Sequence, residues 1–185
     1  MQHVINVGKK VFRKFHSLNR LKRFLPLKTK KLLCTSLIFP TIDYCDVVYS
    51  PSLKVESQQS LQRAQNACVR YICNLRKFDR VSEHYLGLDW MRLDTRQTLH
   101  MLLLLYNILK SQGPQYFRET WVYLQTRRLA SMSLLEIPRH RTRTYGDSYH
   151  VSVVRLWNSL NRDIRDSPTL GSFKISLVKH LKQNR

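Results

Sequence analysis

The chain has 185 residues, of which 43% are hydrophobic; this length suits one domain, and this apolar fraction excludes wholesale disorder. Its 32 Lys and Arg outnumber its 12 Asp and Glu, which gives a formal net charge of +20 and predicts a polyanionic partner, either a phosphate backbone or an acidic membrane surface. A basic protein without such a partner is the alternative, since charge alone names no strand type and no reaction.

The basic residues are unevenly distributed along the chain. Residues 1–31 contain ten Lys and Arg and no acid, and the first carboxylate is that of Asp43. A second cluster lies in a stretch with little helical periodicity and consists of Arg127, Arg128, Arg139, Arg141 and Arg143. We therefore expect two phosphate-facing surfaces, one on a helix and one on a loop.

Three helices are predicted before residue 50. Apolar residues at steps of three and four over 4–25, with basic residues between them, are typical of an amphipathic helix, and Pro26 stops it. A second helix is predicted over about 28–39, and Pro40 ends or kinks it. The third is predicted from Asp43 to Tyr49.

The middle of the chain carries the most regular helical pattern. A helix is predicted over 54–75, and a short one beginning at Ser82 before a turn at Gly87. The strongest helical segment is the Leu-rich stretch 92–111, which ends before Gly113-Pro114.

The last third of the chain alternates helix and loop. A short helix is predicted within 114–123, followed by a polar, Arg-rich loop over 125–147. Ser148 is placed to cap the next helix, and the last helix is predicted over about 172–183.

Together these elements predict an all-α fold, an irregular helical bundle of about six to eight helices with an Arg-rich loop near 125–147. We divide the chain into a helical region (1–124), the basic loop (125–147) and a C-terminal helical pair (148–185). The sequence contains no internal repeat and no low-complexity tract.

The cysteines and the apolar runs indicate an intracellular protein, either nuclear or cytoplasmic. No secretory signal precedes the four cysteines, Cys34, Cys45, Cys68 and Cys73, so free, small, buried thiols are expected. The longest apolar run, 101–106, is too short to span a bilayer.

Asp43 and Asp46 lie three residues apart in "SLIFPTIDYCDVVYSPS" (36–52). On one helix they would share a face within reach of one metal ion, as in two-metal nucleotidyl transfer. Nothing in the sequence supplies the nucleotide pocket that such chemistry needs. We therefore favour the structural alternative, in which these acids cap a helix start after Pro40 or pair with Lys and Arg.

Other catalytic and metal sites are not predicted. Cys68 and Cys73 are five residues apart on a predicted helix, which is not zinc-finger spacing. No phosphate-binding lysine loop, dinucleotide fingerprint or serine elbow is present. We expect no cofactor, no metal and no catalytic residue in this chain.

Aromatic residues among the cations raise the question of base stacking. Trp90, Trp121 and Trp157 could stack on bases near Arg, although Trp157 within "VVRLWNSL" is favoured as a core residue. In "HRTRTY" (140–145), cationic or protonatable residues alternate with Thr, which suits phosphate contacts without base reading. The alternative is a solvated loop.

Five segments of the sequence carry a family resemblance. In chain order they are "SLIFPTIDYCDVVYSPS" (36–52), "LQRAQNACVRYI" (61–72), "RVSEHYLGLDWMRLDTRQTLHMLLLLYNIL" (80–109), "IPRHRTRTYGDSYHVSVVRLWNSL" (137–160) and "IRDSPTLGSFKISLVKHL" (164–181). Together they resemble the C-terminal region of the polyprotein of jockey-like non-LTR retrotransposons. In that family the region follows the fingers and palm of the reverse transcriptase and forms a helical thumb and its continuation.

The resemblance implies an origin in an RNA-directed DNA polymerase from a mobile element, and it implies no polymerase centre in this chain. The family's catalytic carboxylates lie in the palm, on a paired-aspartate turn, and this sequence contains no Asp-Asp dipeptide. Asp43 and Asp46 match a patch that follows the palm, so the resemblance also makes them structural. One departure is Asn161, where the family pattern has a proline.

From charge and resemblance together we expect a non-catalytic C-terminal fragment of such a polymerase that binds RNA or an RNA–DNA hybrid through phosphate contacts. Its other partner is the palm of the parent polyprotein; neither a membrane nor a small-molecule substrate is expected. The alternative is a helical scaffold or protein-interaction remnant. The expected contacts are Lys9, Lys10, Arg13, Lys14, Arg20, Lys22 and Arg23 on the first helix and Arg139, Arg141 and Arg143 in the loop.

Overall fold

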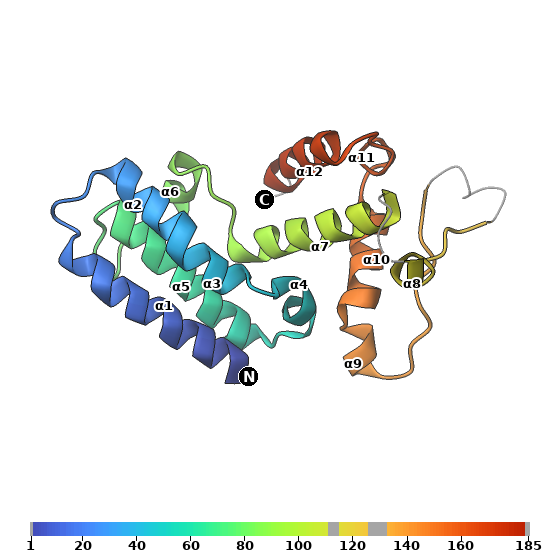
Figure 1. Cartoon of the computed structure of the whole chain (residues 1–185), viewed down its shortest axis with the longest axis horizontal. Helices are drawn as coiled ribbons and strands as arrows, with labels where there is room; N and C mark the ends of the chain where they lie inside the picture. Colours follow the sequence, from blue (N-terminus) through green and yellow to red (C-terminus); the bar gives the residue numbers. More distant parts are fainter. Residues whose placement is uncertain (1, 111–114, 126–132, 184–185) are drawn as a thin grey trace. The chain divides into compact units, whose positions relative to one another are not determined.

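The computed structural model describes residues 2–110, 115–125 and 133–183 (Figure 1). Within these ranges the regular structure is helical, and the only β pairing is one isolated antiparallel bridge between Tyr123 and Leu135. The predicted all-α fold is confirmed, with more helices in these ranges than the six to eight expected.

The chain packs as two compact units. Unit 1 comprises Met1–Asp46 and Leu53–Asp94, and unit 2 comprises Val47–Ser52 and Thr95–Arg185. These are units of packing; the division at residues 124 and 147 made from the sequence stays a prediction.

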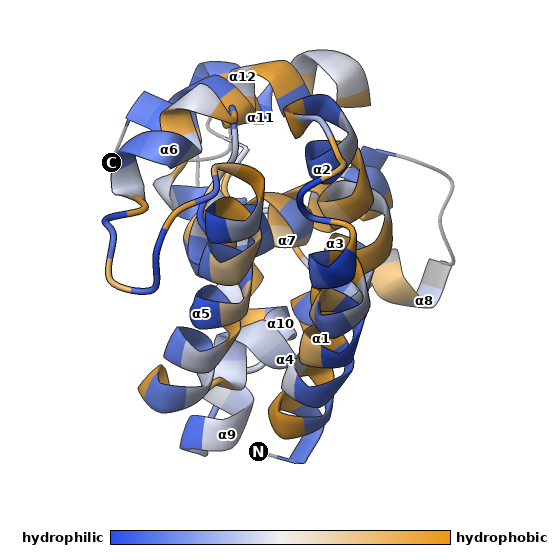
Figure 2. Ribbon diagram, turned by 90° about the vertical axis from the view of Figure 1, so that its left-hand side faces the viewer, coloured by the Kyte–Doolittle hydropathy of each residue, from blue (hydrophilic) through white to orange (hydrophobic). Residues whose placement is uncertain are grey.

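Unit 1 is built around α1 (Gln2–Arg20), which packs against α5 (Val55–Ile72) and α3 (Phe39–Asp43). Figure 2 shows polar and apolar residues alternating along α1, because apolar positions recur at the helical period. The buried stripe consists of Val4, Val7, Val11, Phe15 and Leu18. The short helix α6 (Ser82–Gly87) completes the unit and confirms the predicted start at Ser82.

Helix α1 ends earlier than the sequence pattern predicts. The predicted helix over 4–25 stops at Arg20, and a turn follows in which Leu21 N–H donates to Leu18 O (3.1 Å) and Phe24 N–H to Leu21 O (3.0 Å). These bonds span three residues instead of four, so the helix tightens and ends. Pro26 disfavours helical backbone at Leu25, the residue before it, so it keeps the helix from resuming after this turn but does not itself set the end at Arg20.

The second predicted helix continues through Pro40. Helix α2 (Leu27–Leu33) runs into a π-helical turn, η1 (Cys34–Ile38), and then into α3. The N–H of Phe39 donates to Cys34 O, five residues back. Proline cannot donate and its ring would collide with the carbonyl four residues earlier; the wider turn before Pro40 accommodates both constraints.

The π-helical turn also keeps one side of this helical run buried. Its buried residues recur at every fourth position and are Lys30, Cys34, Ile38 and Ile42. In a pure α-helix, four residues overshoot a full turn by about 40°. One turn with more residues offsets that drift, so all four side chains face the core.

The third predicted helix, Asp43 to Tyr49, is wrong at its start. Helix α3 ends at Asp43, Cys45 adopts a left-handed conformation (φ 54°), and α4 begins at Asp46 (Asp46–Tyr49). A non-glycine residue with positive φ cannot continue a right-handed helix. Cys45 is also exposed and Cys73 is half-buried, which corrects the expectation of buried thiols at these two positions; Cys34 and Cys68 are buried as expected.

Unit 2 contains the C-terminal helices and most of the Leu-rich helix α7 (Leu93–Lys110), which the sequence predicted well. The other helices are α8 (Gln115–Arg118), α9 (Arg143–Gly146), α10 (Tyr149–Ser159), α11 (Arg162–Arg165) and α12 (Leu170–Gln183).

The core of unit 2 is aromatic. The rings of Tyr106 and Phe173 stack with centroids 4.3 Å apart, and Trp157 lies 5.9 Å from Phe173. The buried Tyr106 hydroxyl donates to Ser167 O (2.7 Å), and Trp157 Nε1 donates to Ser133 O (2.9 Å). Buried aromatic residues with satisfied polar atoms are typical of a specific core.

The predicted loop over 125–147 carries more structure than its composition suggests. Leu124 N–H donates to Leu134 O (2.9 Å), and Glu136 N–H donates to Val122 O (2.8 Å). Helix α9 begins at Arg143 and is capped by Thr142, whose hydroxyl accepts from Tyr145 N (3.3 Å). The loop prediction is therefore wrong at these places.

Ser148 stands at the N-cap of α10, as predicted, but its side chain does not cap the helix. Its hydroxyl oxygen is buried and makes no hydrogen bond to any residue that the structure describes. The position was predicted correctly and the interaction was not.

All three tryptophans belong to the core. Trp90 packs on Phe39 (4.5 Å between centroids), and Trp121 Nε1 donates to His150 O (3.2 Å). The core alternative for Trp157 is confirmed. Base stacking by these indoles, the other possibility raised by the sequence, is excluded because their rings are buried.

In the described part of the chain no single helix is long and apolar enough to cross a membrane, whereas one bent pair, Leu27–Asp43 with Asp46–Ser52, meets the criteria of length and composition only.

His150 makes unit 2 sensitive to mild acid. Its ring lies 5.0 Å from that of Trp121, and burial lowers its pKa from the ordinary value of 6.5. The unfolded chain therefore takes up a proton at a higher pH than the folded one, so unit 2 loses stability as pH falls through about 6.5. Melting temperatures over about pH 5 to 8 should show this decline, and His150→Gln should remove part of it.

A decline of equal size in the His150→Gln variant would contradict this assignment.

Candidate nucleic-acid interface

The outward face of α1 carries an exposed row of cations. Lys9, Arg13, His16 and Arg20 follow one another at steps of four, three and four, so they lie on one face of the helix, opposite the buried stripe. No Asp or Glu occurs before Asp43. We call this face, with its three cations Lys9, Arg13 and Arg20 and with His16 between them, the α1 cation row. The three cations belong to the predicted set. His16 is the one residue added to it, and the three-four spacing could have identified it.

Lys10 and Lys14 lie on the flank of α1 and line an open groove of about 610 Å³ with His3, Thr41 and Tyr44. The Lys14 ammonium donates to Leu37 O (2.6 Å) and to Thr41 Oγ1 (2.6 Å). Two of its three N–H groups are therefore used within the protein, whereas Lys10 is exposed at the groove. Tyr44 is an exposed aromatic residue at the same groove that the sequence analysis did not select.

This difference between the two lysines can be measured. Lys14→Met should lower the free energy of unfolding by about 1 kcal/mol, because charge-assisted bonds are lost at an exposed site, with little change in affinity for an RNA–DNA hybrid. Lys10→Met should weaken binding by about fivefold in ~0.1 M salt and leave the unfolding free energy unchanged. Chemical denaturation and hybrid titration of both variants provide the comparison.

The opposite pattern, a destabilised Lys10→Met and a Lys14→Met that binds weakly, would reverse the two roles.

Lys22 and Arg23 lie beyond the end of α1. The prediction placed them on the helix, but both belong to the turn 21–24, because the chain leaves the helix ahead of Pro26. Arg23 is exposed and Lys22 is half-buried. The series of basic side chains on α1 therefore continues beyond Arg20 into the turn that follows the helix.

The second predicted cluster belongs to unit 2. Arg139, Arg141 and Arg143 are exposed; Arg143 opens α9, and its guanidinium lies 3.5 Å from Asp147. An ion pair this exposed contributes little and leaves Arg143 accessible. Arg127 and Arg128 lie outside the described residues.

His140 lies between two neighbours. Its Nε2 is 3.2 Å from the Arg155 guanidinium, and its Nδ1 is 3.0 Å from Pro138 O. The permanently charged residues of "HRTRTY" are Arg141 and Arg143.

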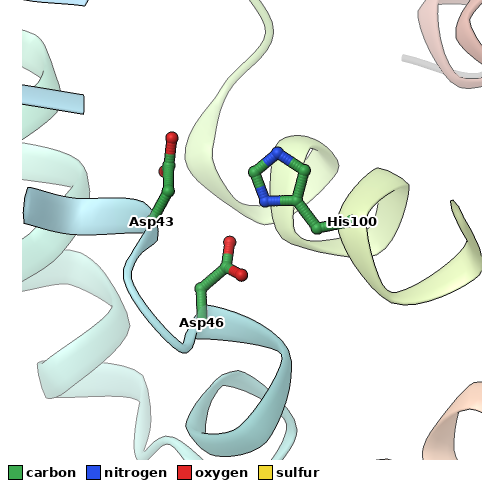
Figure 3. A group of neighbouring side chains, drawn as sticks. All are labelled: Asp43, Asp46 and His100. Atoms are coloured by element: carbon green, nitrogen blue, oxygen red, sulfur yellow. The ribbon is translucent and has the colours of Figure 1, made fainter. Parts of the chain in front are cut away.

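Asp43 and Asp46 are separated by the break between α3 and α4 and do not share a helix face, contrary to the first alternative considered. Asp43 is the last residue of α3, and Asp46 opens α4, where a carboxylate is stabilised by the helix N-terminus (Figure 3). Figure 3 also draws His100, which lies on α7 and is described with unit 2. An oxygen of each carboxylate still lies within 4.8 Å of an oxygen of the other, so the two acids remain close despite the break.

Comparison with protein-family models, with curated proteins and with solved structures gave no match for this chain.

Proposed function

We propose that this protein binds RNA or an RNA–DNA hybrid through its phosphates, without catalysis, and that it is the thumb and post-thumb part of a jockey-like non-LTR retrotransposon reverse transcriptase. The observation that supports this most directly is the α1 cation row. Its cations lie on one exposed helix face, and the sequence has no acid before residue 43 to neutralise them.

The spacing of the row suits a phosphate backbone. Residues three or four apart on a helix lie about 5–6 Å apart, close to the separation of successive phosphates along a strand. Arg and Lys at these positions would contact phosphates without reading base edges, so binding should show little sequence preference. Arg139, Arg141 and Arg143 would provide a second set of phosphate contacts.

The remaining parts of the proposal rest on the sequence. The five segments that resemble the retrotransposon polyprotein imply the polymerase origin, and the absence of an Asp-Asp dipeptide is the reason to expect no polymerisation by this chain. In the parent polyprotein the palm would cover apolar residues that are exposed in unit 1, among them Phe12, Leu32 and Leu37.

The test is a titration of a labelled RNA–DNA hybrid at several salt concentrations. We expect the logarithm of the binding constant to fall linearly with the logarithm of salt concentration, by nearly one unit per phosphate contact. The scaffold alternative predicts no binding in low salt or a slope near zero. Metal-dependent nucleotide incorporation by the purified chain would contradict the non-catalytic part of the proposal.

A further inference from the structure

Two loops of unit 1 carry nearly the same tripeptide. The turn after α1 contains Lys22-Arg23-Phe24, and the loop after α5 contains Arg76-Lys77-Phe78. Each therefore presents two cations followed by one phenylalanine. We call these two tripeptides together the basic-aromatic tip.

The two loops lie at the same end of unit 1. The Lys30 ammonium, near the start of α2, donates to Asn74 Oδ1 just beyond α5 (3.0 Å), and the Tyr71 hydroxyl donates to Leu18 O (3.3 Å). One surface groove is lined by Lys22 and Asn19 from the first loop and the end of α1 and by residues at the end of α5. Figures 1 and 2 agree, since the turn between α1 and α2 and the loop between α5 and α6 project from that end.

The phenylalanines of the tip are the most exposed aromatic side chains that the structure describes. Phe24 is 82% exposed and Phe78 is 90% exposed. Burial of a Phe side chain is strongly favourable in folding, and neither of these exposed rings contributes it to this fold. Single exposed apolar residues need no explanation, but two rings at one end of a unit, each beside two cations, indicate a binding surface.

Backbone hydrogen bonds fix the loop that carries Phe78. Asn74 has a left-handed conformation (φ 55°) and ends α5, with Leu75 N–H bonded to Arg70 O (3.0 Å). Asp79 accepts from Arg76 N (2.7 Å), and Arg70 donates to Asp79 O (3.3 Å). Phe78 is thus held outward on a hydrogen-bonded turn.

The turn that carries Phe24 is fixed in a similar way, by its bonds to Leu18 and Leu21 and by Pro26. Both rings are therefore presented on pre-organised backbone, which limits the entropy lost when a ligand binds.

We propose that the basic-aromatic tip binds unpaired nucleotides, with Phe24 and Phe78 stacking on bases and the adjacent cations contacting phosphates. This inference rests on the proposed function and specifies its ligand as a single-stranded segment. The combination of exposed rings with cations is the one that single-strand binding proteins use, because every base has a face on which a ring can stack.

One observation favours nucleic acid over an anionic membrane as the ligand. The α1 cation row leads to the tip, since its last member, Arg20, is followed directly by the turn with Lys22 and Arg23. A backbone that follows α1 would therefore arrive at Phe24.

The experiment compares a blunt RNA–DNA hybrid, the same hybrid with a single-stranded overhang, and the single strand alone. The double variant Phe24→Ala/Phe78→Ala should bind the single strand and the overhang at least about 30-fold more weakly than the original protein, because stacking contributes roughly 1–3 kcal/mol for each of the two bases. Its affinity for the blunt hybrid should change by less than about twofold. Tyr116→Ala, at another exposed aromatic residue, is the control and should change none of the three.

A second variant distinguishes stacking from simple apolar contact. Phe24→Leu/Phe78→Leu keeps an apolar side chain and loses the ring, so we expect it to bind as weakly as the alanine variant. Phe24→Trp/Phe78→Trp keeps an aromatic ring at both positions and should bind as tightly as the original protein. Vesicles of phosphatidylcholine and phosphatidylserine provide the membrane arm. The inference would be overturned if the original protein and the leucine variant bound these vesicles and the alanine variant did not.

The outcomes also separate this inference from the proposed function. No binding to the blunt hybrid in low salt would contradict the proposed function. A second outcome would contradict only the inference about the basic-aromatic tip. In it, the protein binds the blunt hybrid in a salt-dependent way, the overhang does not raise the affinity, and the alanine variant binds as tightly as the original protein.

Discussion

Replacing Lys9, Arg13 and Arg20 together by Gln is expected to weaken binding of an RNA–DNA hybrid on the order of 100-fold in ~0.1 M salt. These cations occupy one exposed face of α1, so a single strand of phosphates can contact all three. Gln is a good helix former, so α1 should persist in the variant. The slope of the salt dependence should fall by about one for each cation removed.

A matched variant tests whether position or only net charge matters. Lys54, Arg63 and Arg92 are also exposed in unit 1, and replacing them by Gln removes the same charge from outside α1. Because these cations do not belong to the α1 cation row and would make none of its phosphate contacts, this control should lose less than about threefold in affinity. Equal losses in the two variants would show that the cations act only through total charge, and no loss in either would remove α1 as an interface.

Trp157→Ala should lower the free energy of unfolding of unit 2 by about 3–5 kcal/mol. Trp157 is 1% exposed, packs beside Phe173 and donates to Ser133 O. The substitution removes a large apolar volume and leaves the half-buried Ser133 carbonyl without its donor, and each change is destabilising by itself. The loss is large relative to the stability of an ordinary small domain.

Denaturation followed by circular dichroism, with amide hydrogen exchange over 149–183, measures this effect. Ile175→Ala provides the control on α12, since Ile175 is 73% exposed and its truncation should change the unfolding free energy by no more than about 0.5 kcal/mol. A loss below about 1 kcal/mol in Trp157→Ala would mean that the aromatic core of unit 2 is not its main source of stability.

The sequence predicts helices well where one apolar stripe repeats over many turns. Helices α5 and α7 agree closely with the predicted segments 54–75 and 92–111, because hydrophobic periodicity reports directly which face is buried. It predicts poorly where one or two residues decide the backbone. The early end of α1, the π-helical turn before Pro40 and the break at Cys45 each depend on local hydrogen bonding or on a single φ angle.

The candidate site shows the same division. Charge and spacing identify most of the α1 cation row, since exposed cations on a helix repeat at the helical period. They do not show that Lys14 is bonded to Leu37 and Thr41, or that His140 lies beside Arg155. Nor does the sequence bring together Phe24 and Phe78, which are brought to one end of unit 1 by the packing of α1 against α5.

The π-helical turn Cys34–Ile38 sets the rotational phase of everything between it and Asp43. If every residue of this turn were kept but adopted ordinary α-helix, each step of four residues would again overshoot a full turn by about 40°. Ile42, three such steps after Lys30, would then turn about 120° away from it and leave the core, and Thr41 would move away from the Lys14 ammonium that it now accepts from. Loss of one residue from the turn would instead change the steps between the buried residues from four, four and four to four, three and four, which is the spacing of one α-helical face. The turn therefore holds one residue more than an α-helix with the same buried face would need, and a variant shortened by one residue here should keep Ile42 in the core.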